Sequence, residues 1–351
     1  MEFIAEYGLF LAKSVTVLLV IVFIVGFAVS AGHRQKGGDR GHLEVTKLND
    51  EYEDSQDILR DAITEPHQRK ADLKAQHKKE KQEEKARKKS ASKATGEEPP
   101  ARRVFVIDFD GDIKASAVDS MREVITGILS VAGPQDEVVV RLESGGGMVH
   151  SYGLASSQLD RIKQQGISLT VCVDKVAASG GYMMACVADR ILAAPFAIMG
   201  SIGVLAQIPN FHRLLKKHDI DFEELTAGEY KRTLTMFGEN DDKDRAKFVE
   251  DLEDTHNLFK EFVSQHRPAV NIEQVANGDV WYGKRALDNA LVDELKTSDQ
   301  YLIEKIGEGD VFHVEFAHKK TLQEKLGLSI SAAADRLLLT WISRLNNKRF
   351  F

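Results

Sequence analysis

Residues 137–148 read EVVVRLESGGGM, a short apolar run that ends in three consecutive glycines. Such a run, rich in valine and bounded by glycine, predicts a buried β-strand. Helical spacing follows over residues 149–162, and residues 168–173 (SLTVCV) repeat the strand pattern. Upstream, residues 104–109 (VFVIDF) predict another strand and residues 118–129 another helix. Strands that alternate with helices predict an α/β fold built on a mostly parallel sheet.

The composition is that of an ordinary folded chain. Of 351 residues 43% are hydrophobic, and the 7 prolines and 26 glycines exclude a collagen-like or proline-rich chain. Two cysteines exclude a disulfide scaffold, and Cys172 and Cys186 fall in apolar stretches where inert, buried thiols are expected. The net charge of −7 argues against general nucleic-acid binding. No His, Cys or Asp spacing suggests a metal site, and we expect no cofactor.

Residues 14–32 (SVTVLLVIVFIVGFAVSAG) contain no charged side chain. As a helix they would extend for ~28 Å, close to the hydrocarbon thickness of a bilayer. Our interpretation is a retained membrane anchor. A cleaved signal peptide is the alternative, because Val29-Ser30-Ala31 suits a cleavage site. Against it, Glu2 and Glu6 lie near the start and no basic residue stands before Lys13.

The charges that flank this span bear on its orientation. Arg34, Lys36, Arg40 and Lys47 follow it, whereas only Lys13 precedes it. The positive-inside rule would keep the following segment in the cytoplasm, but long soluble domains evade that rule. The side of the membrane that holds the folded domain therefore stays open.

Charge also divides the chain into two parts. Residues 1–103 contain 19 basic and 17 acidic side chains, whereas the remainder contains 28 basic and 37 acidic ones. Within the first part, residues 66–98 almost lack large apolar side chains and cannot bury enough surface to offset the entropy of ordering. We interpret them as a solvated spacer, with binding to anionic lipid head groups as the alternative.

Two small-residue turns follow predicted strands, where α/β proteins place their functional sites. In the first, Ser144-Gly145-Gly146-Gly147-Met148, glycine lets backbone N–H groups approach an oxyanion closely, and no Lys follows as in a phosphate loop. In the second, Ala177-Ala178-Ser179-Gly180-Gly181-Tyr182, a serine hydroxyl stands among small neighbours. Taken alone, the first segment fits an ordinary strand-to-helix turn equally well. The serine of the second segment, taken alone, fits a helix N-cap.

Two further segments are Gly200-Ser201-Ile202-Gly203 and Tyr230-Lys231-Arg232. Together the four segments resemble the signal peptide peptidase A family of serine proteases, and most of all its SohB branch, over essentially the whole chain. The resemblance implies a ClpP/crotonase-like fold and a Ser–Lys dyad without a cofactor. Ser179 then aligns with the nucleophile, Lys231 with the general base, and Ser201 with a hydroxyl that orients the lysine.

The resemblance also implies an oxyanion hole from Gly146, Gly147 and Gly180. Members of the family usually have proline where this chain has Gly145, which puts the rigidity of the turn in question. The residues expected to line the substrate pocket are Met148, Tyr182 and Met183.

The resulting domain prediction has four parts. An anchor over residues 1–33 precedes a charged spacer over 34–103, partly disordered or helical. A protease domain over 104–300 precedes a C-terminal strand and helix over 301–351, where apolar residues at helical spacing suit a subunit contact or a membrane surface. The resemblance implies a single-pass protein of the bacterial inner membrane, a homo-oligomer, that cleaves peptides such as remnant signal peptides.

Several alternatives remain at this stage. The base in an alternative Ser-His-Asp triad would be His150, His212 or His218, although no Gly-x-Ser-x-Gly elbow surrounds the serine. Lys175 is a rival base within the dyad. Lys231 itself would act within its own chain or on a neighbouring copy. A crotonase-like acyl-CoA enzyme and a catalytically silent membrane scaffold are the alternatives to a protease.

Overall fold

The structure is a computed structural model that describes residues 8, 11, 13–17, 41–64 and 102–318. Leu43–Phe316 form one compact unit, and the other described residues belong to a second one. No helix in these described ranges is both long and apolar enough to cross a membrane. Most of the predicted anchor over 14–32 lies outside the described residues, as do the charged stretch 66–98 and residues 319–351 of the predicted C-terminal segment.

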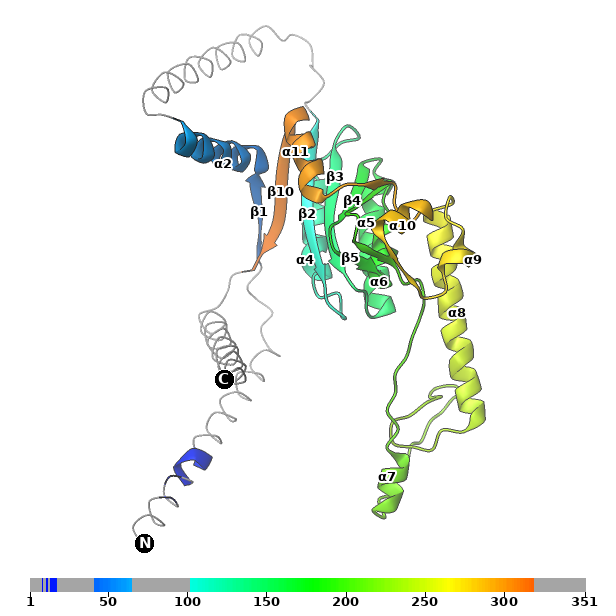
Figure 1. The fold of residues 1–351 in the computed structure, drawn as a ribbon. Coiled ribbons are helices and arrows are strands. Elements are labelled where there is room, and N and C mark those ends of the chain that lie inside the picture. Colours follow the sequence, from blue (N-terminus) through cyan, green and yellow to red (C-terminus); the bar gives the residue numbers. More distant parts are fainter. Residues whose placement is uncertain (1–7, 9–10, 12, 18–40, 65–101, 319–351) are drawn as a thin grey trace, which may run out of the picture. The chain divides into compact units, whose positions relative to one another are not determined.

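A ten-stranded sheet forms the centre of the larger unit (Figure 1). Its main path runs in the order β1-β10-β2-β3-β4-β6-β9. The strands are β1 (His42–Lys47), β10 (Asp310–Ala317), β2 (Arg103–Gly111), β3 (Glu137–Ser144), β4 (Ser168–Val173), β6 (Arg190–Ala193) and β9 (Glu294–Leu295). Every pair from β10 to β9 is parallel, so the predicted α/β class is confirmed.

A short branch leaves this path at the end of β3. Ser144 pairs with Ala177 of β5 (Val176–Ala178), and β5 pairs in parallel with β7 (Ile198–Gly200). Strand β8 (Val280–Tyr282) runs antiparallel to β7. The branch brings the ends of β3, β5 and β7 together, and these are the strands that precede the predicted functional turns.

The two faces of the sheet bury different sets of side chains, because successive residues of a strand point to opposite sides. Phe105, Ile107 and Phe109 of β2 belong to the large core, which includes buried residues of α4 (Val118–Leu129), α5 (Val149–Gln164) and α6 (Gly180–Ala185). Val104 and Val106 belong instead to a smaller cluster with residues of α11 (Ser298–Glu308).

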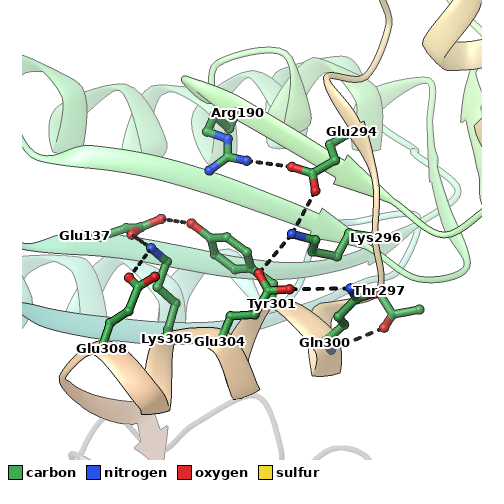
Figure 2. Close-up of polar contacts among 10 residues, drawn as sticks. All are labelled: Glu137, Arg190, Glu294, Lys296, Thr297, Gln300, Tyr301, Glu304, Lys305 and Glu308. Atoms are coloured by element: carbon green, nitrogen blue, oxygen red, sulfur yellow. Dashed lines mark hydrogen bonds and ion pairs between the residues drawn. The ribbon is translucent and has the colours of Figure 1, made fainter.

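Helix α11 is fixed to the sheet by one buried carboxylate (Figure 2). The Glu137 side chain accepts hydrogen bonds from the hydroxyls of Tyr301 (2.5 Å) and Thr170 (2.7 Å). The Lys305 ammonium lies 3.6 Å from the same carboxylate. Cationic groups also lie within 6 Å of the centre of the Tyr301 ring, from Arg190, Lys296 and Lys305. Every polar atom of the Glu137 carboxylate therefore has a partner, as a buried charge requires.

The sheet extends beyond the predicted domain limits of 104 and 300 on both sides. Strand β10 pairs with β2, so the C-terminal strand is an integral part of the fold. Strand β1 and helix α2 (Leu48–Ile63) come from the stretch predicted to be a spacer, which is therefore structured over this part. The Asn49 side chain holds them in place, donating to Gly309 O (2.9 Å) and accepting from Val311 N (2.8 Å).

The segment from Val204 to Asp241, which we call the arm, connects β7 to the long helix α8 (Asp242–His266). Helix α7 (His212–Lys217) lies in it, and Figure 1 shows α7 away from the sheet. Most arm residues are exposed. Helices α9 (Ile272–Val275) and α10 (Gly283–Asp288) complete the unit.

Candidate active site

Ser179 stands at a sharp turn between β5 and α6. Its φ of 53° lies in the left-handed region, which costs a non-glycine residue on the order of 1–3 kcal/mol. The turn is held from both sides, because Ser179 N donates to Gly200 O (2.8 Å) and Ser179 O accepts from Met183 N (3.0 Å). Ser179 occupies the N-cap position of α6, but its side chain makes no capping hydrogen bond. The side chain of this strained residue is half-buried, and its hydroxyl does not hold the turn together.

The glycine turn after β3 packs directly on this serine. Gly146 has a φ of 87°, and a Cβ placed there would lie 2.6 Å from Gly180 N and 2.7 Å from the Ser179 Cβ. A Cβ at Gly147 would overlap the backbone of Ile113. Gly145, in contrast, has open space around it. The second and third glycines are therefore required by the close approach of two backbone segments, and the first is not.

The N–H groups of the turn have different partners. Gly146 N donates to the Ser144 hydroxyl (3.1 Å), so in this arrangement it already has a partner, and its oxyanion role stays a prediction. Gly147 N has no hydrogen-bond partner within residues 102–318. Gly180 N belongs to the first turn of α6, where helical N–H groups lack intrahelical partners. Gly180 N therefore lies beside the serine, and Gly147 N is a further N–H group of the glycine turn without a partner within residues 102–318.

Ser201 lies next to this turn as predicted. Ala178 pairs with Gly200 in the parallel β5–β7 ladder, so Ser179 and Ser201 follow neighbouring positions. Ser201 also has a positive φ (50°), and its N–H donates to Asp279 O (2.7 Å). The structure therefore brings the predicted nucleophile, the glycine turn and the second serine into one site.

Lys231 is not part of this assembly. It lies in the arm, exposed, with its N–H donating to Gly228 O (3.1 Å). There it borders an open groove of about 730 Å³ whose other walls include Phe222, Leu225 and Phe237, but not Ser179. Among the described residues no lysine hydrogen-bonds to Ser179. A single chain therefore presents the serine and the predicted base at separate places.

The rival bases are no better placed. The Lys175 ammonium binds the Glu143 carboxylate (2.8 and 3.1 Å), which raises the pKa of Lys175, the opposite of what a base requires. His150 is exposed on the first turn of α5, and the nearest carboxylate to the His212 ring belongs to Glu239, 3.9 Å away. Neither histidine, nor His218, hydrogen-bonds to Ser179 in the described part of the chain.

The predicted substrate-pocket residues separate into two groups. Met148 follows the glycine turn and is 43% exposed, which suits a substrate contact. Tyr182 is fully buried and donates to Leu291 O (3.0 Å), and Met183 is nearly buried as well. Tyr182 is therefore a core residue, because its position on the short helix α6 turns the ring into the large core. The expectation that it contacts substrate is wrong.

The sequence interpretation missed the loop at residues 112–116. The Ile113 carbonyl accepts from Met148 N (2.8 Å) and lies against Gly147, while the Ile113 side chain is 71% exposed beside the turn. The Asp112 carboxylate shapes this loop by accepting from Ser116 N and from the Ser116 hydroxyl (2.8 Å each). An Asp followed four residues later by Ser was the available signal.

The two thiols take no part in this site. Burial raises the pKa of Cys172 to about 12, and burial also raises that of Cys186. Both are free and buried, as predicted. In the described ranges no group of three His, Cys, Asp or Glu side chains could hold a metal ion.

Comparison with known families assigns a class to this arrangement of serine and glycine turns. Residues 2–159 match the peptidase family S49 N-terminal model, and residues 161–311 match the peptidase family S49 model. The chain therefore belongs to peptidase family S49, a family of serine-type proteases.

Its relatives then define the branch. A probable protease SohB from Haemophilus influenzae is 50% identical over 339 residues, covering 96% of each chain. A putative protease SohB from Buchnera aphidicola subsp. Baizongia pistaciae is 43% identical over 357 residues, covering 100% of each. Protease 4 of Haemophilus influenzae is 30% identical over 165 residues, covering 45% of this chain and 26% of that protein. The chain belongs to the SohB branch.

Proposed function

We propose that the chain is an endopeptidase in which Ser179 is the nucleophile and Lys231 the general base of a Ser–Lys dyad. The main support is the strained turn at Ser179, whose side chain makes no capping bond and whose Cβ packs against Gly146 beside Gly180 N. Strain of this kind persists only where the surrounding structure enforces it, and it gathers at active sites.

The proposed reaction follows the general course of acyl transfer. The lysine amine takes the Ser179 hydroxyl proton while the oxygen attacks the substrate carbonyl, and backbone N–H donors stabilise the oxyanion that forms. The lysine then returns the proton to the leaving amine, and water hydrolyses the acyl-enzyme by the same steps in reverse order. Ser201 orients the lysine amine.

We further propose that the lysine comes from a neighbouring copy in a homo-oligomer. Ser179 and Lys231 lie apart within one chain, and the arm that holds Lys231 exposes many large apolar side chains. These include Leu205 (78% exposed), Leu225 (92%), Ile220, Tyr230, Met236 and Phe237. An exposed apolar surface of this kind is typical of a protein interface. Packing there would also exclude water from the lysine, which a neutral amine base requires.

The remaining features of the proposal rest on sequence. Residues 14–32 would anchor the protein in the inner membrane as a single span, and the catalytic unit, with a ClpP/crotonase-like fold, would meet peptides or unfolded chains near that surface. Exposed Met148 and Ile113 beside the turn favour apolar substrate side chains, as remnant signal peptides would offer.

Mixing two inactive variants tests the dyad and its origin together. Ser179→Ala and Lys231→Ala should each abolish hydrolysis of an unfolded substrate such as casein, whereas Lys175→Ala should remain active. If the lysine acts on a neighbour, co-expressing the two inactive variants restores activity, since about one quarter of the sites in a random head-to-tail ring become complete.

Each negative result would contradict a different part of the proposed function. Activity in Lys231→Ala would overturn the dyad, and lack of restoration in the mixture would overturn only the transfer between copies. Turnover of an acyl-CoA thioester by Ser179→Ala would favour the crotonase-like alternative. A scaffold predicts that a fluorophosphonate probe leaves Ser179 unlabelled.

A further inference from the structure

The Ser144 side chain lies just before the glycine turn and is almost completely buried. Its hydroxyl oxygen accepts from Gly146 N (3.1 Å) and lies 2.5 Å from the hydroxyl of Tyr152 on α5. The Tyr152 hydroxyl in turn donates to Asp112 O (2.7 Å). Three hydrogen bonds therefore join the glycine turn, a helix and the loop at residues 112–116.

The two hydroxyls in this series have more acceptors than protons. A tyrosine hydroxyl has one proton, and here it is donated to the Asp112 carbonyl. The Ser144 hydroxyl lies 2.5 Å from the Tyr152 hydroxyl and 3.3 Å from Gly111 O, so its single proton has two acceptors, while its lone pairs face Gly146 N–H. Burial raises the pKa of Tyr152, so the tyrosine keeps its proton over the whole range in which a protease would be assayed.

The far end of the series returns to the same turn. Beyond Asp112, the Ile113 carbonyl accepts from Met148 N and lies against Gly147. The glycine turn is thus held at Gly146 through Ser144, and at Gly147 and Met148 through the loop that Tyr152 fixes. The ring of Tyr152 also fills the space beside Gly180, where a Cβ would overlap it. The same tyrosine therefore contacts Ser144 before the glycine turn and borders Gly180 after the serine.

We propose that Ser144 and Tyr152 are positioning residues that hold the glycine turn in the geometry that stabilises the oxyanion. Neither touches the reacting atoms, and both act through the turn. The inference rests on the proposed function, in which Ser179 attacks a carbonyl beside Gly147 and Gly180.

Tyr152→Phe is the sharpest test, because it removes one buried oxygen and keeps the ring. We expect kcat to fall about 10-fold, less than the ~100-fold that follows loss of an oxyanion-hole donor itself, with KM changed less than about twofold. Ser144→Ala should lower kcat further, because it also releases Gly146 N–H. The double variant should be no worse than Ser144→Ala alone, since the two hydroxyls act as a unit.

Tyr301→Phe is the matched control, since it removes another buried tyrosine hydroxyl far along the chain from the turn. It should leave kcat unchanged even if the protein becomes less stable. A peptide boronate, which forms a tetrahedral anion on serine, should bind Tyr152→Phe more weakly in proportion to kcat. Binding of uncleaved peptide to Tyr152→Phe in a Ser179→Ala background should not change.

A folded Tyr152→Phe and a folded Ser144→Ala with wild-type kcat would overturn the inference. A fall in kcat for Tyr301→Phe as large as for Tyr152→Phe would also overturn it, because general destabilisation would then explain both. Either result is separate from failure of the proposed function, which would appear as peptide hydrolysis by Ser179→Ala.

Discussion

The turn around Ser179 and the arm around Lys231 depend on their own chain to very different degrees. The turn is held by backbone hydrogen bonds on both sides, by close contact with Gly146, and by a fully buried tyrosine. The arm exposes Leu225 almost completely and holds Lys231 in an open groove. One chain therefore completes the part of the proposed site that contains Ser179 and the glycine turn, but it leaves Lys231 outside that part. The proposed dyad across two copies therefore predicts that activity depends on assembly.

The largest effect is expected within the turn itself. Gly147→Ala would force a Cβ into the Ile113 backbone, and we expect it to abolish hydrolysis and to destabilise the fold. Gly145→Ala is the matched change two positions earlier, where the added methyl meets nothing within 4 Å. It should remain active, with unfolding free energy within about 0.5 kcal/mol of wild type. Casein hydrolysis and thermal unfolding of both variants give the answer, and equal effects would contradict the proposed packing.

A substitution in the arm should lower assembly and activity but not the stability of a single chain. Leu225→Asp places a charge on a side chain that is 92% exposed in one chain, so the unfolding temperature should hardly change. If the arm packs on a neighbour, the buried charge should weaken assembly and lower activity by at least about 10-fold. Light scattering in detergent and casein hydrolysis measure the two effects.

A control comes from Val131→Asp, which alters another exposed apolar residue outside the arm. It should assemble and cleave like the wild type. An assembled, fully active Leu225→Asp would refute the arm interface, and Lys231 would then need another route to Ser179.

The difference between the turn around Ser179 and the arm also explains which features the sequence could predict. The strands are local patterns, and the structure confirms them. The glycine turn and Ser179 are local patterns as well, and the structure places Gly146 against Ser179. The pairing of β10 with β2 joins Val311 to Val104, about 200 residues apart, and has no local signal. Strand β1 was missed for the same reason, since its place depends on Asn49 binding the backbone at Gly309 and Val311.

Within the site, the direction in which a side chain points was harder to predict than which residues belong to the site. Tyr182 and Tyr152 are both fully buried, yet only Tyr152 reaches the glycine turn. Sequence spacing gave no means of separating them, because the direction of each ring depends on how α5 and α6 pack on the sheet. Lys231 illustrates a different limit, since its proposed partner belongs to another copy of the chain.

A stability effect without an activity effect is expected at α11. Tyr301→Phe removes a hydroxyl that donates to the buried Glu137 carboxylate, and should lower the unfolding free energy by about 1–3 kcal/mol. Glu137 lies at the start of β3, whereas the glycine turn and Ser179 follow the ends of β3 and β5. The kcat should therefore stay at the wild-type value. Urea unfolding followed by tryptophan fluorescence, with activity measured in parallel, checks both statements. A fall in kcat would mean that this end of β3 is coupled to the turn.

The smallest effect is expected at the β2–β10 contact, where His313 and Arg141 both bind the Asp108 carboxylate (3.1 and 2.6 Å). Burial alone would raise the pKa of Asp108, but these hydrogen bonds outweigh it and lower the pKa to about 2. The bond to Asp108 likewise raises the pKa of His313.

A raised histidine pKa stabilises the fold below the unfolded value of about 6.5, and this contribution disappears as pH rises through the folded value. The depressed Asp108 pKa contributes above about 4 and is lost as pH falls toward 2. Wild type should therefore exceed His313→Gln in stability at pH 5.5 by less than about 1 kcal/mol, because the pair is partly exposed, and the difference should shrink by pH 8.5. Thermal unfolding at the two pH values measures it, and a difference that grows with pH would show that the histidine stabilises the sheet in its neutral form.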